Sequence, residues 1–98
     1  MAEENNGKNR KYLSEGEKDS LELGKFYFLN GKYKEAIANF NRVLEINKSN
    51  EEALYNLGLI YENQNQKDIA VKMFERAVGI NPDYKIAQQH LNKLKGLK

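Results

Sequence analysis

Few side chains in this sequence have the chemistry that catalysis needs. Glu51 and Glu52 stand together at the expected start of a helix, and His90 is the sole histidine. An acidic pair in a first turn is typical of a helix stabilised at its positive end. Catalysis requires a nucleophile beside a base, a metal cluster, or paired carboxylates in a pocket. The chain has no cysteine, and its 7 glycines are scattered rather than gathered in a phosphate-binding loop. The sequence therefore predicts no enzyme, no bound metal and no cofactor.

Charge and composition exclude several further kinds of partner. The 98 residues include 16 basic and 14 acidic side chains, a net charge of +2, and 40% of the residues are hydrophobic. Such a weak field does not drive binding to nucleic acid or to anionic lipid. Basic residues gather only near the two ends, as Lys8, Arg10 and Lys11 and as Lys93, Lys95 and Lys98. Because no apolar run is long enough for a signal peptide or a membrane span, a single cytoplasmic domain without nucleic acid or membrane partners is expected.

The sequence repeats itself with an offset of 34 residues, as from Gly24 to Gly58. The identical pairs are Glu17 and Glu51, Leu23 and Leu57, Gly24 and Gly58, Tyr27 and Tyr61, Ala36 and Ala70, Phe40 and Phe74, Arg42 and Arg76, Ile46 and Ile80, and Asn47 and Asn81. Most of them fall three or four residues apart within each copy, which is the spacing of one helix face. Two copies of one helical unit are predicted, with a partial third copy that begins near Lys85.

Polar residues divide each copy into two helices. Ser14 followed by Glu17 is the signature of a capping box and predicts a helix start, and Asn30-Gly31 predicts a left-handed end. Asn65 stands where the first copy has its turn glycine. Asparagine tolerates positive φ better than most residues, so the turn is expected to be kept.

The remaining helix ends follow from the linkers. Ser49 or Asn50 is expected to cap the third helix, and the segment 81–83, Asn-Pro-Asp, to cap the last. The expected helices cover about residues 15–30, 33–46, 51–64, 67–80 and 83–95. Residues 1–14 are expected to form a flexible polar tail, and residues 15–98 one domain with repeats at about 17–50 and 51–84 and a capping helix at about 83–95.

These residues resemble the pattern of the tetratricopeptide repeat family, a helix, a turn and a helix in 34 residues. The matching positions are Leu23, Gly24, Tyr27, Ala36 and Phe40 in the first copy, and Leu54, Leu57, Gly58, Tyr61, Ala70, Phe74 and Pro82 in the second. The sequence departs from the pattern at Ser20, where a large aromatic residue is usual, and at Lys48, which replaces a proline. The resemblance implies an all-α fold, a right-handed superhelix of antiparallel helix-turn-helix repeats with five helices, and a non-catalytic role in protein–protein interaction.

Small and large residues are placed so that neighbouring helices interlock. Gly24 and Gly58 are expected to let the second helix of the same repeat approach closely. The last helix resembles the terminating helix of such arrays. Its single apolar stripe of Ala87, Leu91 and Leu94 is expected to pack on the helix before it and to seal the C-terminal end.

By resemblance, the first helix of each repeat lines a concave groove that holds a peptide. The residues at those positions are Lys18, Leu21, Lys25, Phe28, Glu52, Tyr55, Asn56, Leu59, Glu62, Gln89 and His90. Some of them are not needed for the core stripe of their helices, so an exposed apolar patch rimmed by charge is predicted. These residues are Leu21, Phe28, Tyr55 and Leu59. The alternative is ordinary scattered surface apolarity.

One class of ligand is disfavoured by the residues present. Family members that grip the C-terminal carboxylates of heat-shock chaperones use Lys, Asn, Asn, Lys and Arg, at positions occupied here by Leu21, Lys25, Asn56, Ile86 and His90. Only Asn56 matches, and without cationic donors the charge-assisted bonds to carboxylate are lost. Lys18 and Lys25 are still expected to favour a mildly acidic peptide.

The first helix has an apolar face without an evident neighbour. Leu23 and Phe26 fall in register with the stripe by which the last helix packs on its predecessor, yet no helix is predicted before them. Tyr12 and Leu13 folding back, a second copy of the chain, or upstream sequence would each cover Phe26. The second possibility gives an alternative function, a structural self-assembly module that forms a homo-oligomer through Leu23 and Phe26.

Overall fold

Helices account for most of residues 14–97, the part of the chain that the computed structural model describes. They are α1 (Glu15–Leu29), α2 (Tyr33–Ile46), α3 (Glu51–Asn63), α4 (Lys67–Ile80) and α5 (Lys85–Leu94). The bounds predicted for α2 and α4 are confirmed. Helices α1 and α3 end one residue before the predicted bound, and α5 is shorter at both ends. The predicted polar tail lies outside the described residues, apart from Ser14.

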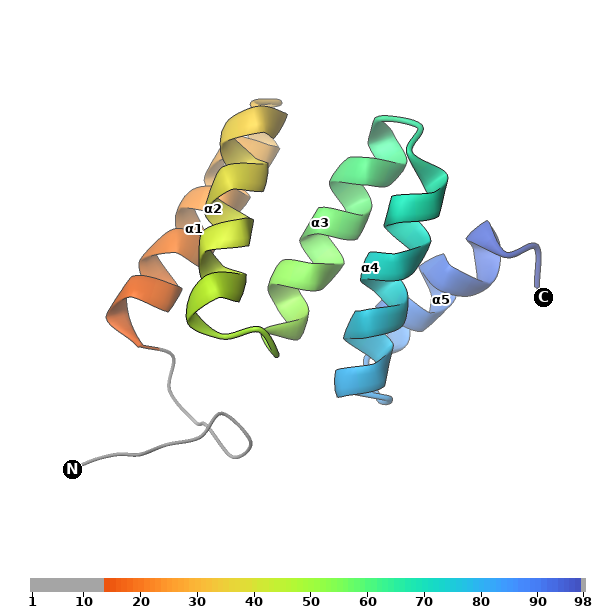
Figure 1. The fold of residues 1–98 in the computed structure, drawn as a ribbon. Helices are drawn as coiled ribbons and strands as arrows, with labels where there is room; N and C mark the ends of the chain where they lie inside the picture. The colour runs from red at the N-terminus through yellow and green to blue at the C-terminus, as the bar shows by residue number, and fades with distance from the viewer. Residues whose placement is uncertain (1–13, 98) are drawn as a thin grey trace.

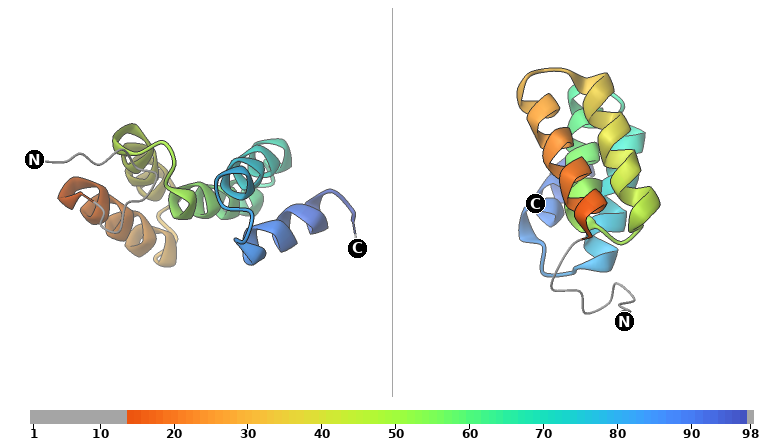
Figure 2. Two further views of the ribbon diagram at one scale, coloured as in Figure 1. Left: turned by 90° about the horizontal axis from the view of Figure 1, so that it is seen from below. Right: turned by 90° about the vertical axis from the view of Figure 1, so that its left-hand side faces the viewer.

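The helices form two hairpins and a final single helix, arranged as two layers. Figure 1 shows the α1–α2 hairpin beside the α3–α4 hairpin, with α5 against the far end. In Figure 2, α1, α3 and α5 lie along one side and α2 and α4 along the other. The assembly is elongated, 46 × 29 × 16 Å, because each hairpin packs only on its neighbours. No helix within residues 14–97 has both the length and the apolar character of a membrane span.

Side chains cap the first helix of each repeat as the sequence predicts. The Ser14 hydroxyl accepts a hydrogen bond from the Glu17 amide at 3.1 Å, and the Asn50 side chain accepts one from the Ala53 amide at 2.9 Å. Asn65 has a φ of 61° in the turn between α3 and α4. The left-handed turn predicted at this asparagine is therefore confirmed.

The prediction that segment 81–83 caps the last helix is wrong. The Asn81 side chain accepts a hydrogen bond from the Asp83 amide at 3.1 Å, which closes the turn itself. Helix α5 begins two residues later, at Lys85, and the residue before it is Tyr84, whose side chain makes no capping hydrogen bond. A phenol cannot fold back onto the first turn as asparagine does, so α5 starts without side-chain help.

Each hairpin is held together by a phenylalanine packed on a glycine. A Cβ atom placed on Gly24 would lie 2.7 Å from the Phe40 ring, and one on Gly58 would lie 2.6 Å from the Phe74 ring. Both rings are fully buried. Real Cβ atoms essentially never lie within 3.0 Å of such a neighbour, so a larger residue at either position would force the ring to shift. The predicted close approach is therefore confirmed.

The first and last helices differ in what covers their apolar stripes. Leu91 of α5 is 6% exposed and belongs to the core formed with α3 and α4. In α1, Leu23 is 47% exposed and Phe26 is 58% exposed. Within the described residues, therefore, no helix covers this face of α1 in the way that α2 covers the equivalent face of α3. The possibility that Tyr12 and Leu13 fold back over Phe26 lies outside the described residues.

Candidate functional site

The predicted groove residues lie on α1, α3 and α5, the three helices that form one layer of the molecule. We call the side chains at those positions the A-helix face. Lys18 and Gln89 are exposed, and most of the others are half-buried. Helices α3 and α5 contribute Tyr55 and His90 to one ring cluster on this face, and α1 and α3 are joined by an ion pair. Phe28 stands apart from the cluster, with its ring 5.8 Å from that of Tyr33 on α2.

The predicted exposed apolar patch on this face is wrong. Leu21 is only 5% exposed and belongs to the core that joins α1, α2 and α3. The other predicted patch residues are half-buried and rest against the core; they are Phe28, Tyr55 and Leu59. The core around Leu21 contains residues of α3 as well as of α2, so Leu21 is buried where the three helices meet. The face therefore offers the partly exposed edges of anchored side chains instead of a continuous apolar surface.

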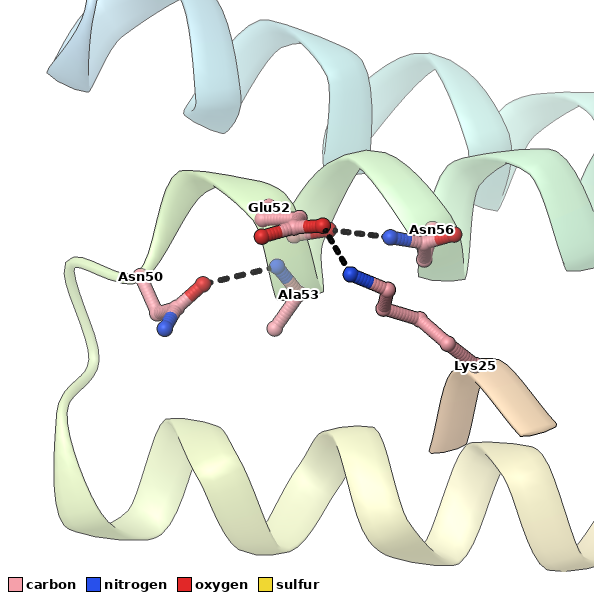
Figure 3. A network of polar contacts seen from close by, with 5 residues as sticks. All are labelled: Lys25, Asn50, Glu52, Ala53 and Asn56. Atoms are coloured by element: carbon pink, nitrogen blue, oxygen red, sulfur yellow. Dashed lines mark hydrogen bonds and ion pairs between the residues drawn. The ribbon is translucent and has the colours of Figure 1, made fainter. Parts of the chain in front are cut away.

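An ion pair crosses the face between α1 and α3. Lys25 Nζ lies 2.8 Å from Glu52 Oε2, and both side chains are 43% exposed (Figure 3). Asn56 is buried and donates its side-chain amide to the Glu52 carbonyl at 2.8 Å (Figure 3). One N–H of the Asn56 amide is thus used within its own helix, and Lys25 already has an anionic partner. A ligand carboxylate would compete with Glu52 for Lys25.

Aromatic rings gather where α3 meets the start of α5. The Tyr55 ring contacts those of Tyr84, Phe74 and His90, with centroid separations of 5.4, 5.7 and 5.7 Å. His90 stacks on Phe74 at 5.3 Å and 22°. Phe74 is fully buried, whereas Tyr55 and Tyr84 are half-buried. The two tyrosines are therefore partly exposed to solvent while they pack against the core.

His90 faces Glu62 across the gap between α5 and α3. Its Nδ1 atom is 3.3 Å from Glu62 Oε1 but is buried without a hydrogen bond of good geometry in the described structure. No serine or threonine belongs to the A-helix face, so His90 has no nucleophile to activate there. Within residues 14–97, no three histidine, aspartate or glutamate side chains are placed to hold a metal ion.

A surface depression elsewhere has a different character. It measures about 360 Å³, lies at the turn between α3 and α4, and is lined by Asn65, Gln66, Lys67, Asp68 and Ile69. None of these residues belongs to the A-helix face, and all are exposed. The depression contains no ring or buried polar group that would orient a ligand, so it is not the candidate site.

Burial and neighbouring carboxylates act together on the two tyrosines. Burial, followed by the charge of Glu52, then Tyr55 and Glu51, raises the pKa of Tyr84 to about 12. Burial and the charge of Glu62 raise the pKa of Tyr55 as well. Both effects disfavour a tyrosinate anion, so the surroundings of the two phenols are negative as well as partly desolvated.

Alkaline titration should reveal this environment. A tyrosine whose pKa is about 10 unfolded and about 12 folded holds its proton more tightly in the folded state. Its contribution to stability is complete below pH 10 and is lost as the pH rises towards 12. Urea unfolding between pH 9 and 12 should therefore show a smaller loss of stability in Tyr84→Phe than in the parent. Equal losses would contradict the assignment.

Tyr84 was absent from the residues predicted for the groove. Its counterpart at the 34-residue offset is Asn50, which caps α3, so the register assigns position 84 to a helix cap. One feature of the sequence could have identified Tyr84 as a groove residue. An aromatic residue stands here at the repeat position where Asn50 caps α3, directly before a helix whose start lacks a good cap. A large ring at that position needs another place to pack, and Tyr55 supplies it.

Antiparallel helix pairs, each locked by a phenylalanine on a glycine and stacked with a repeat of 34 residues, define a helical repeat protein. Comparison with known families gives the particular class. Models described as TPR repeat and tetratricopeptide repeat match residues 24–65 and 51–84, and the chain belongs to the tetratricopeptide repeat family. It is 32% identical over 71 residues to mouse tetratricopeptide repeat protein 14, a match over 72% of this chain and 9% of that protein. Tetratricopeptide repeats generally mediate protein–protein interaction and are typically non-catalytic.

Proposed function

We propose that this domain binds a peptide segment of a partner protein on the A-helix face, without catalysis. The observation that carries the proposal is the pair of half-buried rings of Tyr55 and Tyr84, which pack together beside the core and remain partly exposed. Rigid aromatic groups of this kind lose little entropy on binding and often dominate the affinity of an interface. Exposed Lys18 and Gln89 lie on the outer helices of the face and would form its polar rim.

The charges of the face favour a partner different from the acidic peptide suggested by the lysines alone. Lys25 is paired with Glu52, and Glu62 lies beside the aromatic cluster. The exposed ion pair contributes little to stability, so a ligand group can replace one of its members at small cost. We therefore propose a segment of mixed polarity rather than a strongly acidic one.

A peptide-display selection tests the function. Sequences selected on the immobilised domain should bind in solution, and Tyr55→Ala should weaken them at least tenfold while circular dichroism shows intact helices. Lys18→Glu should also change the affinity for the selected peptides. Lys72→Glu, the same change at an exposed position of α4, should leave that affinity unaltered. Failure to select any peptide, or equal effects of the two lysine variants, would contradict binding on this face.

A second candidate function is self-association through the uncovered side of α1. We propose it because Leu23 and Phe26 are 47% and 58% exposed although their counterparts in α3 and α5 pack on a preceding helix. Repeat arrays derive their stability from such interfaces, so a second copy of the chain would supply the missing neighbour.

Sedimentation at high micromolar concentration tests the second function. The parent should form a species larger than 11.4 kDa, and Phe26→Glu should return it to the monomer. Ile80→Glu, on α4 and also partly exposed, serves as the control and should not change the mass. If the parent is monomeric and Phe26→Glu does not alter stability, self-association is wrong.

A further inference from the structure

The ring cluster between α3 and α5 lies beside carboxylates on the same face. Glu52 and Tyr55 are three residues apart on α3, which places their side chains next to each other on one side of the helix. The Tyr84 ring lies 5.4 Å from that of Tyr55, at an angle of 48°. Two tilted, half-buried rings therefore lie together at the start of α5, and Glu52 is the neighbour of one of them on the surface of α3.

The Glu52 carboxylate has room for a second cation. Its Oε2 atom accepts a hydrogen bond from Lys25 at 2.8 Å, while its other oxygen accepts none from any residue that the structure describes. The side chain is 43% exposed, so solvent and ligands reach it. Figure 3 shows Lys25 reaching the carboxylate from α1.

The electrostatics at the rings favour a positive group. The charges of Glu51, Glu52 and Glu62 contribute to the raised pKa values of Tyr84 and Tyr55, so the potential at both phenols is negative. Aromatic faces attract cations independently, through the negative charge above the ring. Rings and carboxylates thus favour the same kind of ligand.

We propose that Tyr55, Tyr84 and Glu52 bind the guanidinium group of an arginine side chain in the partner segment. A guanidinium is planar and weakly hydrated, so it stacks on a ring while its edge donates two hydrogen bonds to a carboxylate. A lysine ammonium is compact and strongly hydrated, and it fits this combination less well. The inference rests on the proposed peptide-binding function and specifies which side chain the partner must present.

Nuclear magnetic resonance on the full chain tests the proposal with a small probe. N-acetyl-arginine amide should shift the signals of Tyr55, Tyr84 and Glu52, with a dissociation constant on the order of millimolar. N-acetyl-lysine amide should bind several-fold more weakly, and N-acetyl-norleucine amide should leave the three signals unchanged. Equal shifts with the arginine and lysine probes would overturn the proposal.

Variants separate a built site from general attraction. Glu52→Gln should weaken binding of the arginine probe about five- to tenfold. Glu45→Gln, the same change at an exposed position of α2, should have no effect on this binding. Tyr84→Phe should retain the probe because the ring remains, and Tyr84→Ser should lose it. Equal effects of the two glutamate variants would overturn the guanidinium site even if Tyr84→Ser failed to fold.

The outcomes also distinguish this proposal from the function on which it rests. Selected peptides that lack arginine, together with no response to the arginine probe, would overturn the guanidinium site and leave peptide binding intact. Binding of the arginine probe with the predicted variant effects, but no selected peptides, would support the site and contradict the broader function.

Discussion

Replacing Phe74 with alanine should unfold most of the isolated chain near physiological temperature. The ring is fully buried, packs on Gly58 of α3 and stacks on His90 of α5, so its removal empties the junction of three helices. Such a truncation costs about 3 to 5 kcal/mol, and domains of this size are stable by only about 5 to 15 kcal/mol. Circular dichroism should show a thermal midpoint lowered by more than about 12 °C, or no cooperative transition.

Ile69→Ala provides the control for this loss. Ile69 lies on the same helix, but it is 37% exposed, so its removal leaves no enclosed cavity. Its midpoint should remain within a few degrees of the parent, as is usual for surface substitutions. A Phe74→Ala midpoint equally close to the parent would contradict the view that the glycine–phenylalanine contact holds each repeat together. Phe40→Ala should behave like Phe74→Ala, because its ring packs on Gly24 in the same way.

Gly58, against which the Phe74 ring packs, offers a sharper test of the same contact. Gly58→Ala introduces a methyl group 2.6 Å from the Phe74 ring and should cost about 1 to 3 kcal/mol through overpacking. Phe74→Leu alone removes volume at the same place. Combined, the two changes partly compensate, so the double variant should be more stable than the sum of the single losses predicts. Additive losses would mean that the two side chains do not share one space.

The repeat was predictable because its determinants recur. Gly24 with Phe40 and Gly58 with Phe74 have the same separation in each copy, and a small residue opposite a large one has few packing solutions. Asn65 was interpretable for a similar reason: the turn must contain a residue at positive φ, and asparagine is one of the few that tolerate it. These features depend on neighbours within one hairpin, so the spacing of residues within one repeat is enough to predict them.

Residues whose neighbours belong to another hairpin were harder to predict. Leu21 was assigned to the groove from its position on α1, but it belongs to a core that includes residues of α3, which no spacing within one repeat reveals. Tyr84 was overlooked because its role depends on a ring in α3. Glu17 was interpreted only as part of a helix cap. Leu23 and Phe26, the proposed self-association face, are 47% and 58% exposed in the described structure, and association through them stays a prediction.

Glu17 shows most clearly how the two repeats are joined. The side chain is fully buried, and its Oε2 atom accepts hydrogen bonds from the side-chain amides of Asn47 at 2.7 Å and Asn50 at 2.8 Å. The oxygens of these two amides accept bonds from the backbone amides of Ser49 and Ala53. One carboxylate of α1 thus orients both the turn after α2 and the cap of α3.

The corresponding network in the second repeat is incomplete. Glu51 is only half-buried, and it accepts a hydrogen bond from Asn81 at a longer 3.3 Å. Tyr84 replaces the second asparagine and cannot complete the set, which explains why α5 begins without a side-chain cap. Glu17 and Glu51 therefore occupy the same position in the two repeats, but Glu17 orients two asparagine side chains and Glu51 orients one. This difference makes the two residues a suitable pair for comparison.

Glu17→Ala should consequently destabilise the domain by about 2 to 4 kcal/mol, since it leaves amide donors without their acceptor, one of them buried, and loosens the cap of α3. Glu51→Ala should cost less than about 1 kcal/mol, because water can replace the carboxylate at a half-buried site. Glu17→Gln retains an acceptor oxygen and the volume, so its loss should lie between the two. Urea unfolding of the three variants measures the difference. Equal losses for Glu17→Ala and Glu51→Ala would mean that the buried carboxylate does not couple α1 to the cap of α3, and that apolar contacts alone align the repeats.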